Sequence, residues 1–226
     1  MGGLGTVTDK RLQRRLTAWW VLIGVLTLLN FSAYFSDGDT PNDVLYRYEA
    51  AIVGFLFYML ILGIILLIGA GLDRRETFAL RRPLSWGVAL GLAVILVFTM
   101  LIVAAALEPV LHAGEAQGLD PPGWDAGRAP AFLLNAIVVA VVGPIVEELT
   151  FRGIGFFLLA QFGQVAAVLV TAVAFALTHG ILEGLPVFFI IGVALAFIRA
   201  RTNSIYPSIV MHAGFNAIGV IAGVFN

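Results

Sequence analysis

Residues Ala50–Leu72 read AAIVGFLFYMLILGIILLIGAGL, an apolar stretch without a charged side chain. A helix of about 20 apolar residues spans the hydrocarbon core of a bilayer, because it satisfies its own backbone hydrogen bonds where water is absent. This stretch therefore predicts a transmembrane helix.

The composition of the whole chain supports the same interpretation. Of its 226 residues, 60% are hydrophobic and only 12% are charged, and the mean hydropathy is +0.99. Since a soluble domain carries roughly 25% charged residues, we expect an integral multi-pass membrane protein in contact with the lipid bilayer. A formal net charge of −1 argues against nucleic acid as a partner, because phosphate binding needs a basic surface. The absence of cysteine excludes thiolate nucleophiles and cysteine-based metal sites.

The apolar pattern predicts an all-α fold, a polytopic transmembrane helix bundle of seven to eight helices. The expected segments are Thr17–Phe35, Ala50–Leu72, Trp86–Leu107, Ala131–Ala160, Val165–Thr178, Pro186–Ile198 and Ile205–Phe225. The fourth segment is too long for one straight span, and a break at Gly143-Pro144 would divide it and give the eighth helix. The pairs Gly87/Gly91 and Gly219/Gly223 are taken as helix packing, and the oligomeric state is left open.

The loop charges predict the orientation. Basic residues before the first segment and after the second are Lys10, Arg11, Arg14, Arg15, Arg74, Arg75, Arg81 and Arg82. Acidic residues in the first and third loops are Asp37, Asp39, Asp43, Glu49, Glu108, Glu115, Asp120 and Asp125. Cytoplasmic loops accumulate Lys and Arg, so we expect a cytoplasmic N-terminus in the plasma membrane. The long loop Glu108–Pro130 then lies on the opposite side.

Polar residues within the last four segments and their loops are the candidates for function. They are Glu147, Glu148, Arg152, His179, Glu183, His212 and Asn216. An ionisable side chain inside a bilayer costs a few kcal/mol, which makes each one a functional hypothesis. Glu183 follows the fifth segment in a loop, where we expect it to be solvated.

Helical spacing separates the two adjacent glutamates. Glu148 and Arg152 are four residues apart, so they can pair along one helix face. Glu147 points about 100° away from Glu148 and is free to act as a general acid or base. The alternative is that all three charges form one structural network that locks this helix to its neighbours.

The two later motifs add imidazoles and an amide. His212 and Asn216 are four residues apart, so they present two adjacent hydrogen-bond donors that suit an oxyanion; the alternative is a hydrogen bond that only joins two helices. His179 ends the fifth segment, where a lone histidine is commonly structural. At 1.5 Å per residue, Glu147 and His179 lie about 20 Å from the cytoplasmic boundary, and His212 and Asn216 about 12 to 18 Å. The four residues therefore fall into one layer.

Three motifs in this order, Glu147-Glu148-x-x-x-Arg152, Phe175-x-x-x-His179 and His212-x-x-x-Asn216, resemble the type II CAAX prenyl endopeptidase family, also called the CPBP or Abi family of intramembrane proteases. The resemblance covers the C-terminal half. It divides the chain into a basic cytoplasmic tail (1–16), three accessory transmembrane helices (17–107) and a catalytic transmembrane core (131–225).

The resemblance implies an intramembrane endopeptidase that cleaves a membrane-associated peptide or protein, including prenylated CAAX-type substrates. Glu147 and His179 would activate a water, while His212 and Asn216 would stabilise the oxyanion. The expected ion pair of Glu148 and Arg152 would support these four residues. No motif contains an obvious serine or threonine nucleophile, which favours direct attack by water.

A metal is the mechanistic alternative. Glu147, His179 and His212 could supply a zinc site, although the local HExxH pattern is absent. We expect a metal-free mechanism without a cofactor. Two other functions stay open: a non-enzymatic membrane scaffold or immunity protein, and a proton-coupled transporter with a broken helix at Gly143-Pro144.

Overall fold

The computed structural model describes residues 4–36, 43–112 and 123–225. Within these ranges every regular element is a helix, which confirms the expected all-α bundle. The α-helices are α1 (Leu4–Tyr34), α2 (Tyr48–Ile68), α3 (Arg74–Thr77), α4 (Trp86–Leu111), α6 (Ala129–Ile137), α7 (Gly143–Glu148), α8 (Phe156–Leu159), α9 (Gln164–Thr178), α10 (Leu185–Thr202) and α11 (Tyr206–Phe225). Short 3₁₀ turns are η1 (Val44–Tyr46), η2 (Ala126–Arg128) and η5 (Ala160–Phe162), and π-helical turns are η3 (Val138–Val142) and η4 (Leu149–Gly155).

Among the described residues, six helical stretches are long and apolar enough to cross a membrane, so the protein is an integral multi-pass membrane protein. They are Lys10–Tyr34, Tyr48–Ile68, Trp86–Leu111, Ala126–Phe162, Leu185–Thr202 and Tyr206–Val224. The fifth expected segment is α9, whose 15 residues extend about 22 Å. That length is less than the roughly 30 Å of a bilayer core, so α9 ends within the apolar layer.

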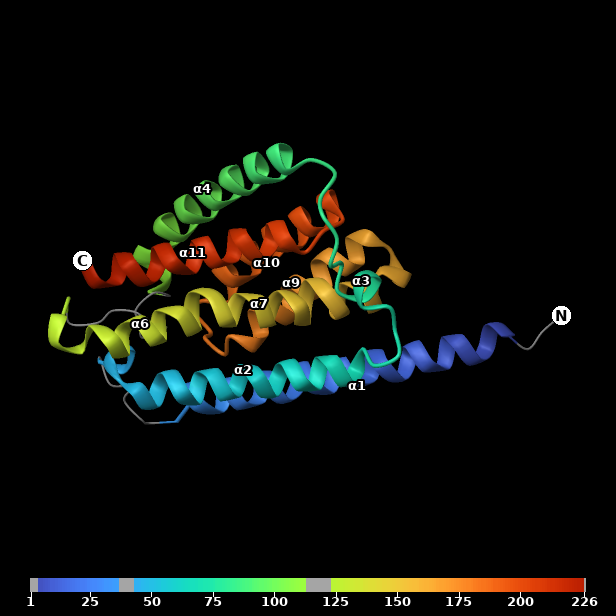
Figure 1. Cartoon of the computed structure of the whole chain (residues 1–226), viewed down its shortest axis with the longest axis horizontal. Coiled ribbons are helices and arrows are strands. Elements are labelled where there is room, and N and C mark those ends of the chain that lie inside the picture. The colour runs from blue at the N-terminus through green and yellow to red at the C-terminus, as the bar shows by residue number, and fades with distance from the viewer. Residues whose placement is uncertain (1–3, 37–42, 113–122, 226) are drawn as a thin grey trace.

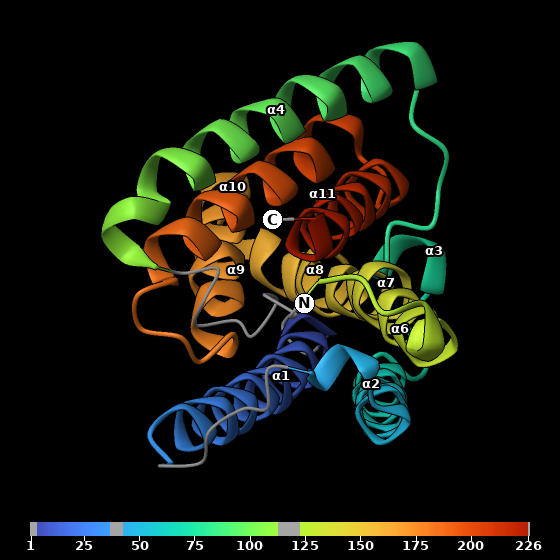
Figure 2. The same ribbon diagram turned by 90° about the vertical axis from the view of Figure 1, so that its left-hand side faces the viewer.

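The long helices lie side by side with α1 and α2 along one side and α4 along the other (Figures 1 and 2). The stretch from 126 to 162, together with α9, α10 and α11, lies between them. Helices α9 and α10 pack closely, because Gly192 brings the backbone of α10 against Ala172.

The helix does not break at Gly143-Pro144, contrary to the alternative considered from the sequence. Pro144 is in the first turn of α7, directly after the π-helical turn Val138–Val142. Proline lacks an N–H and its ring clashes with the carbonyl four residues earlier. A widened turn accommodates that clash without ending the helix, and a second one follows from Leu149.

The helical stretch from 126 to 162 is fixed to the first half of the chain by two sets of polar contacts. The buried Asn135 amide donates to the carbonyls of Leu45, Arg47 and Ala131 at 2.9–3.0 Å. The buried Trp19 indole N–H donates to the Thr150 carbonyl at 3.0 Å. Each contact satisfies groups that would otherwise be costly in an apolar interior.

The chain ends and loops differ in extent from the segments expected from the sequence. Helix α1 already begins at Leu4, so the basic stretch before residue 17 continues the helix. Helix α4 extends to Leu111 and a helix resumes at Ala126, which shortens the long loop from both sides. The expected acidic loop residues Asp37, Asp39, Glu115 and Asp120 lie outside the described residues.

The apolar residues divide into an interior set and an outward set. The side chains of Ile65, Ile154 and Leu195 are fully buried. Leu67 is 75% exposed and Ile95 is 64% exposed, although both are strongly apolar. Such an outer surface is stable when lipid surrounds it.

Candidate active site

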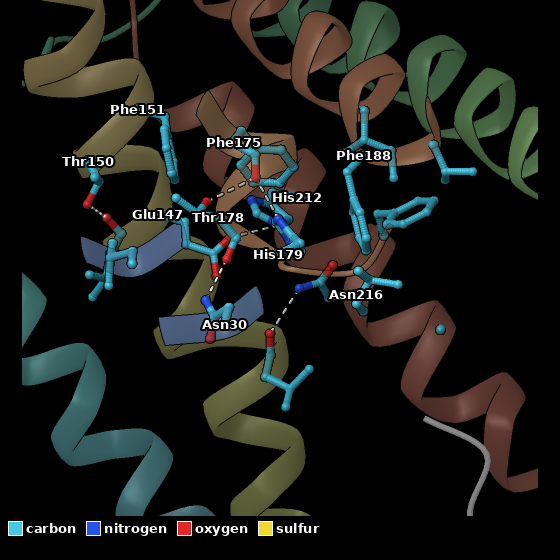
Figure 3. Close-up of a pocket in the computed structure, with 18 of the residues that line it drawn as sticks. Asn30, Glu147, Thr150, Phe151, Phe175, Thr178, His179, Phe188, His212 and Asn216 are labelled. Carbon is cyan, nitrogen blue, oxygen red and sulfur yellow. Dashed lines mark hydrogen bonds and ion pairs between the residues drawn. The ribbon is translucent and has the colours of Figure 1, made fainter. Parts of the chain in front are cut away.

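A cavity of about 760 Å³ lies among the helices and brings the four sequence-predicted site residues together. Glu147 reaches it from α7, His179 from the end of α9, and His212 and Asn216 from α11 (Figure 3). The layer expected from helical depth is therefore a shared cavity in the structure.

The two oxygens of Glu147 have different surroundings. Oε1 accepts a hydrogen bond of 2.7 Å from the hydroxyl of Tyr58 on α2. Oε2 is buried and has no hydrogen-bond partner among the described residues. Its neighbour is Nε2 of His212 at 3.8 Å, which is too long for a direct hydrogen bond. One oxygen is thus held in place, and the other is an unused acceptor.

Glu148 and Arg152 form the ion pair expected from their spacing, with no exposure of either side chain. Glu148 Oε1 accepts from Arg152 Nη1 at 3.0 Å and from His212 Nδ1 at 2.9 Å. Arg152 Nη2 donates to the Gly192 carbonyl at 2.8 Å. Neither residue of the pair lines the cavity. Glu148 therefore holds the His212 ring from a position outside the cavity lining. The charges of Glu148 and Arg152 compensate each other where solvation is lost.

The His179 ring is fixed by its own helix and by an aromatic neighbour. Nδ1 lies 2.7 Å from the Phe175 carbonyl, four residues earlier. A carbonyl only accepts, so Nδ1 carries the proton and Nε2 of the neutral ring is an acceptor. The ring also stacks on Phe188, with 4.0 Å between centroids. The Phe175 ring contacts both imidazoles, with centroids 4.5 Å from His179 and 5.6 Å from His212.

Asn216 combines a structural contact with a free donor position. Its Nδ2 donates to the Val139 carbonyl at 3.1 Å, which joins α11 to the π-helical turn. The alternative of a hydrogen bond between helices is therefore present for this residue. A carboxamide nitrogen carries two protons, so one N–H is left for a further acceptor in the cavity.

Sequence reasoning missed the contribution of the first three spans. Tyr58 on α2 bonds the central carboxylate, and Asn30 on α1 lines the cavity and donates to the Thr178 carbonyl at 2.5 Å. A signal was present, since Asn30 and Tyr58 are polar positions within apolar stretches. Neither position belongs to the three family motifs, which begin only at Glu147.

Glu183 lies outside the cavity, as expected from its loop position. The Tyr34 hydroxyl is 2.6 Å from both carboxylate oxygens, and the pair is solvent-exposed. This hydrogen bond lowers the pKa of Glu183 from its ordinary value. The contact ties the end of α1 to the turn after α9.

A zinc ion would need at least three of the described His, Asp or Glu side chains around one point. Among them, no three His, Asp or Glu side chains are placed as a ligand group for a metal ion. Nδ1 of His179 is engaged with a carbonyl and Nδ1 of His212 with a carboxylate. Metal-bound histidines commonly make such bonds with their second ring nitrogen, so these contacts leave the zinc alternative open.

The fold and the site define a class: a multi-pass helical membrane protein with a carboxylate, two imidazoles and an amide around an internal cavity. Residues 129–218 match the family described as Type II CAAX prenyl endopeptidase Rce1-like. This match confirms the resemblance inferred from the three motifs, over the segment that contains them.

A relative supports the same grouping. The Bacillus subtilis (strain 168) protein named "Putative membrane peptidase YdiL" is 37% identical over 89 residues, which are 39% of this chain. The match covers 36% of that protein's length. No solved structure matches the chain significantly.

Proposed function

We propose that the protein is an intramembrane endopeptidase that hydrolyses a peptide bond of a membrane-associated substrate. The observation that carries this proposal is the convergence of Glu147, His179, His212 and Asn216 on one cavity. The similarity of residues 129–218 to a family of prenyl endopeptidases supports it.

The unpartnered oxygen of Glu147 suits the activation of water. A water in the cavity has two protons to donate, and Glu147 Oε2 and His179 Nε2 are both acceptors. In this mechanism the water oxygen attacks the carbonyl carbon while its proton passes to Glu147. Tyr58 keeps the carboxylate oriented, since it holds the other oxygen. General base catalysis of this kind typically accelerates a reaction by 10²- to about 10⁴-fold.

The negative charge then develops on the carbonyl oxygen, where hydrogen-bond donors are needed. The second N–H of Asn216 supplies one donor. His212 supplies another from Nε2 when its ring carries both protons, and Glu148 and Glu147 lie on its two sides as counter-charges. As the C–N bond breaks, the proton held by Glu147 passes to the leaving nitrogen. Every atom of the water is then accounted for in the new carboxyl and amino ends.

The catalytic test compares the wild type with Glu147→Gln and His179→Ala in purified, reconstituted protein. Both variants should lose cleavage of an apolar reporter peptide by at least about 100-fold, with an unchanged yield of folded protein. A non-enzymatic scaffold or a proton-coupled transporter predicts no cleavage that depends on Glu147. Cleavage that persists in both variants contradicts the proposal.

Water activation in this proposal needs no metal. A strong chelator should therefore leave the cleavage rate unchanged. Loss of activity that returns with added zinc would establish the metal-dependent alternative. The proposed location is the plasma membrane with a cytoplasmic N-terminus, which the charge distribution favours.

A further inference from the structure

The cavity reaches towards only one end of the helix bundle. On α11 the lining residues run from His212 to Gly223, close to the C-terminal end of that helix. On α4 they are Ala104 and Glu108, and on α1 they are Leu26 and Asn30, again near the helix end. The described lining residues include none from the opposite ends of these three helices.

The two ends of the bundle carry different charges. Arg15 on α1 donates to the carbonyls of Ile68 and Ala70, so the basic start of α1 lies beside the end of α2. Helix α3, which contains Arg74 and Arg75, lies at the same end (Figure 1). The start of α6 and the C-terminus lie at the other end. By the preference of basic residues for the cytoplasm, the cavity lined by the described residues extends towards the non-cytoplasmic side.

The path from Glu147 towards the arginine-bearing end is closed. Between the Glu147 carboxylate and this end lies the buried ion pair of Glu148 and Arg152. The side chains of Trp19, Ile154 and Leu158 fill the same region and are at most 1% exposed. An extended peptide could pass through this packing only if the core separated.

We propose that the substrate is a peptide segment exposed on the non-cytoplasmic side, which reaches Glu147 along the Gly219–Gly223 side of α11. This inference rests on the proposed endopeptidase function and narrows its substrate class. Exported peptides and outward-facing ends of membrane-anchored proteins belong to this class, whereas prenylated C-termini in the cytoplasm do not. Most of the lining side chains are apolar, so the bound segment is apolar near the cleaved bond.

The chain contains no cysteine, which allows a clean test of the direction of access. Ala222 lines the cavity near its open end, and Arg74 is exposed at the opposite end. Ala222→Cys and Arg74→Cys are each reconstituted in both orientations into phosphatidylcholine vesicles. A pool of quenched fluorogenic apolar decapeptides is added outside only, before and after treatment with a bulky membrane-impermeant maleimide.

Only molecules whose cavity faces outward can cleave the external peptide if the inference is correct. The maleimide should then remove cleavage by Ala222→Cys by at least about tenfold and leave cleavage by Arg74→Cys unchanged. The reverse pattern would show access from the arginine-bearing end and overturn the inference. In intact cells the same reagent should label Ala222→Cys without permeabilisation; labelling only after permeabilisation would place the opening in the cytoplasm.

A matched pair of glycines tests the route along α11. A Cβ at Gly219 or at Gly214 meets no atom within 4 Å, but only Gly219 lines the cavity. Gly219→Leu should lower kcat/KM by about tenfold, mainly through KM, whereas Gly214→Leu should not. Equal effects of both changes would contradict this route.

Glu147→Gln in the Ala222→Cys background separates the two proposals. Cleavage that depends on Glu147 but survives labelling overturns only the direction of access. If no cleavage depends on Glu147, the endopeptidase function fails and the substrate inference fails with it.

Discussion

The hydrogen bond from Tyr58 to Glu147 makes a quantitative prediction about catalysis. Tyr58→Phe removes the donor of the 2.7 Å bond and leaves both oxygens of Glu147 without a hydrogen-bond partner among the described residues. Hydrogen bonds to charged groups contribute about 1.5–3 kcal/mol. At about 1.4 kcal/mol per tenfold change, kcat should fall by about 10- to 150-fold. The change in KM should be small, because the hydroxyl positions the carboxylate.

Gly143 offers an independent route to the same perturbation. A Cβ at this position would lie 2.8 Å from the Tyr58 hydroxyl oxygen and 2.9 Å from its Cζ. Gly143→Ala should therefore displace the ring and lower kcat in the same direction. Because both changes act on one contact, the double variant should lose less than the product of the two single losses.

The assay is cleavage of the reporter peptide by reconstituted protein, corrected for the folded fraction measured by size-exclusion chromatography. Tyr46→Phe is the matched control, since its hydroxyl donates to the Gly123 carbonyl at 2.7 Å and lies outside the cavity. It should cost stability without lowering kcat. The reasoning is refuted if Tyr58→Phe retains the wild-type kcat, or if both tyrosine variants lose activity only in proportion to folded protein.

Three further predictions concern stability. Arg152→Ala leaves the buried Glu148 carboxylate without its cation and should destabilise the protein by about 3–5 kcal/mol, measured by thermal unfolding in detergent. Asn135→Ala leaves the buried Leu45 carbonyl without its donor and should cost about 1–3 kcal/mol; an unchanged melting temperature would contradict this. The hydrogen bond from Arg128 lowers the pKa of Asp125. The Asp125 carboxylate therefore stabilises the fold above its ordinary pKa of 3.8, and this stabilisation is lost as the pH falls from 3.8 through the lowered pKa of the folded state. The melting-temperature difference between wild type and Asp125→Ala should then shrink on acidification.

The sequence allowed the prediction of much of the candidate site because polar residues stand out in apolar helices. The spacing of Glu148 and Arg152 predicted their ion pair, and the angle to Glu147 predicted that its carboxylate points elsewhere. The 1.5 Å rise per residue placed His179 and His212 in one layer with it. These inferences need only helical geometry, which the membrane enforces.

Other features depend on which helix faces which, and periodicity does not determine that. Tyr58 and Asn30 belong to helices treated as accessory, yet both line the cavity. The partners of Asn216 and Trp19 are backbone carbonyls, which every residue has. Gly143-Pro144 marked the position of the first widened turn, but the sequence did not distinguish a widened turn from a break in the helix.

These widened turns have a consequence for the phase of the helix that contains Glu147. A π turn takes up one residue more than an α turn, and Asn135 and Thr150 anchor the helix on either side of the carboxylate. Glu147 therefore faces the cavity only because the number of residues between the anchors at Asn135 and Thr150 gives the helix the right rotation at position 147. Adding or deleting one residue between these anchors would rotate the carboxylate by about 100°, away from its partners, while the apolar helix itself would still form.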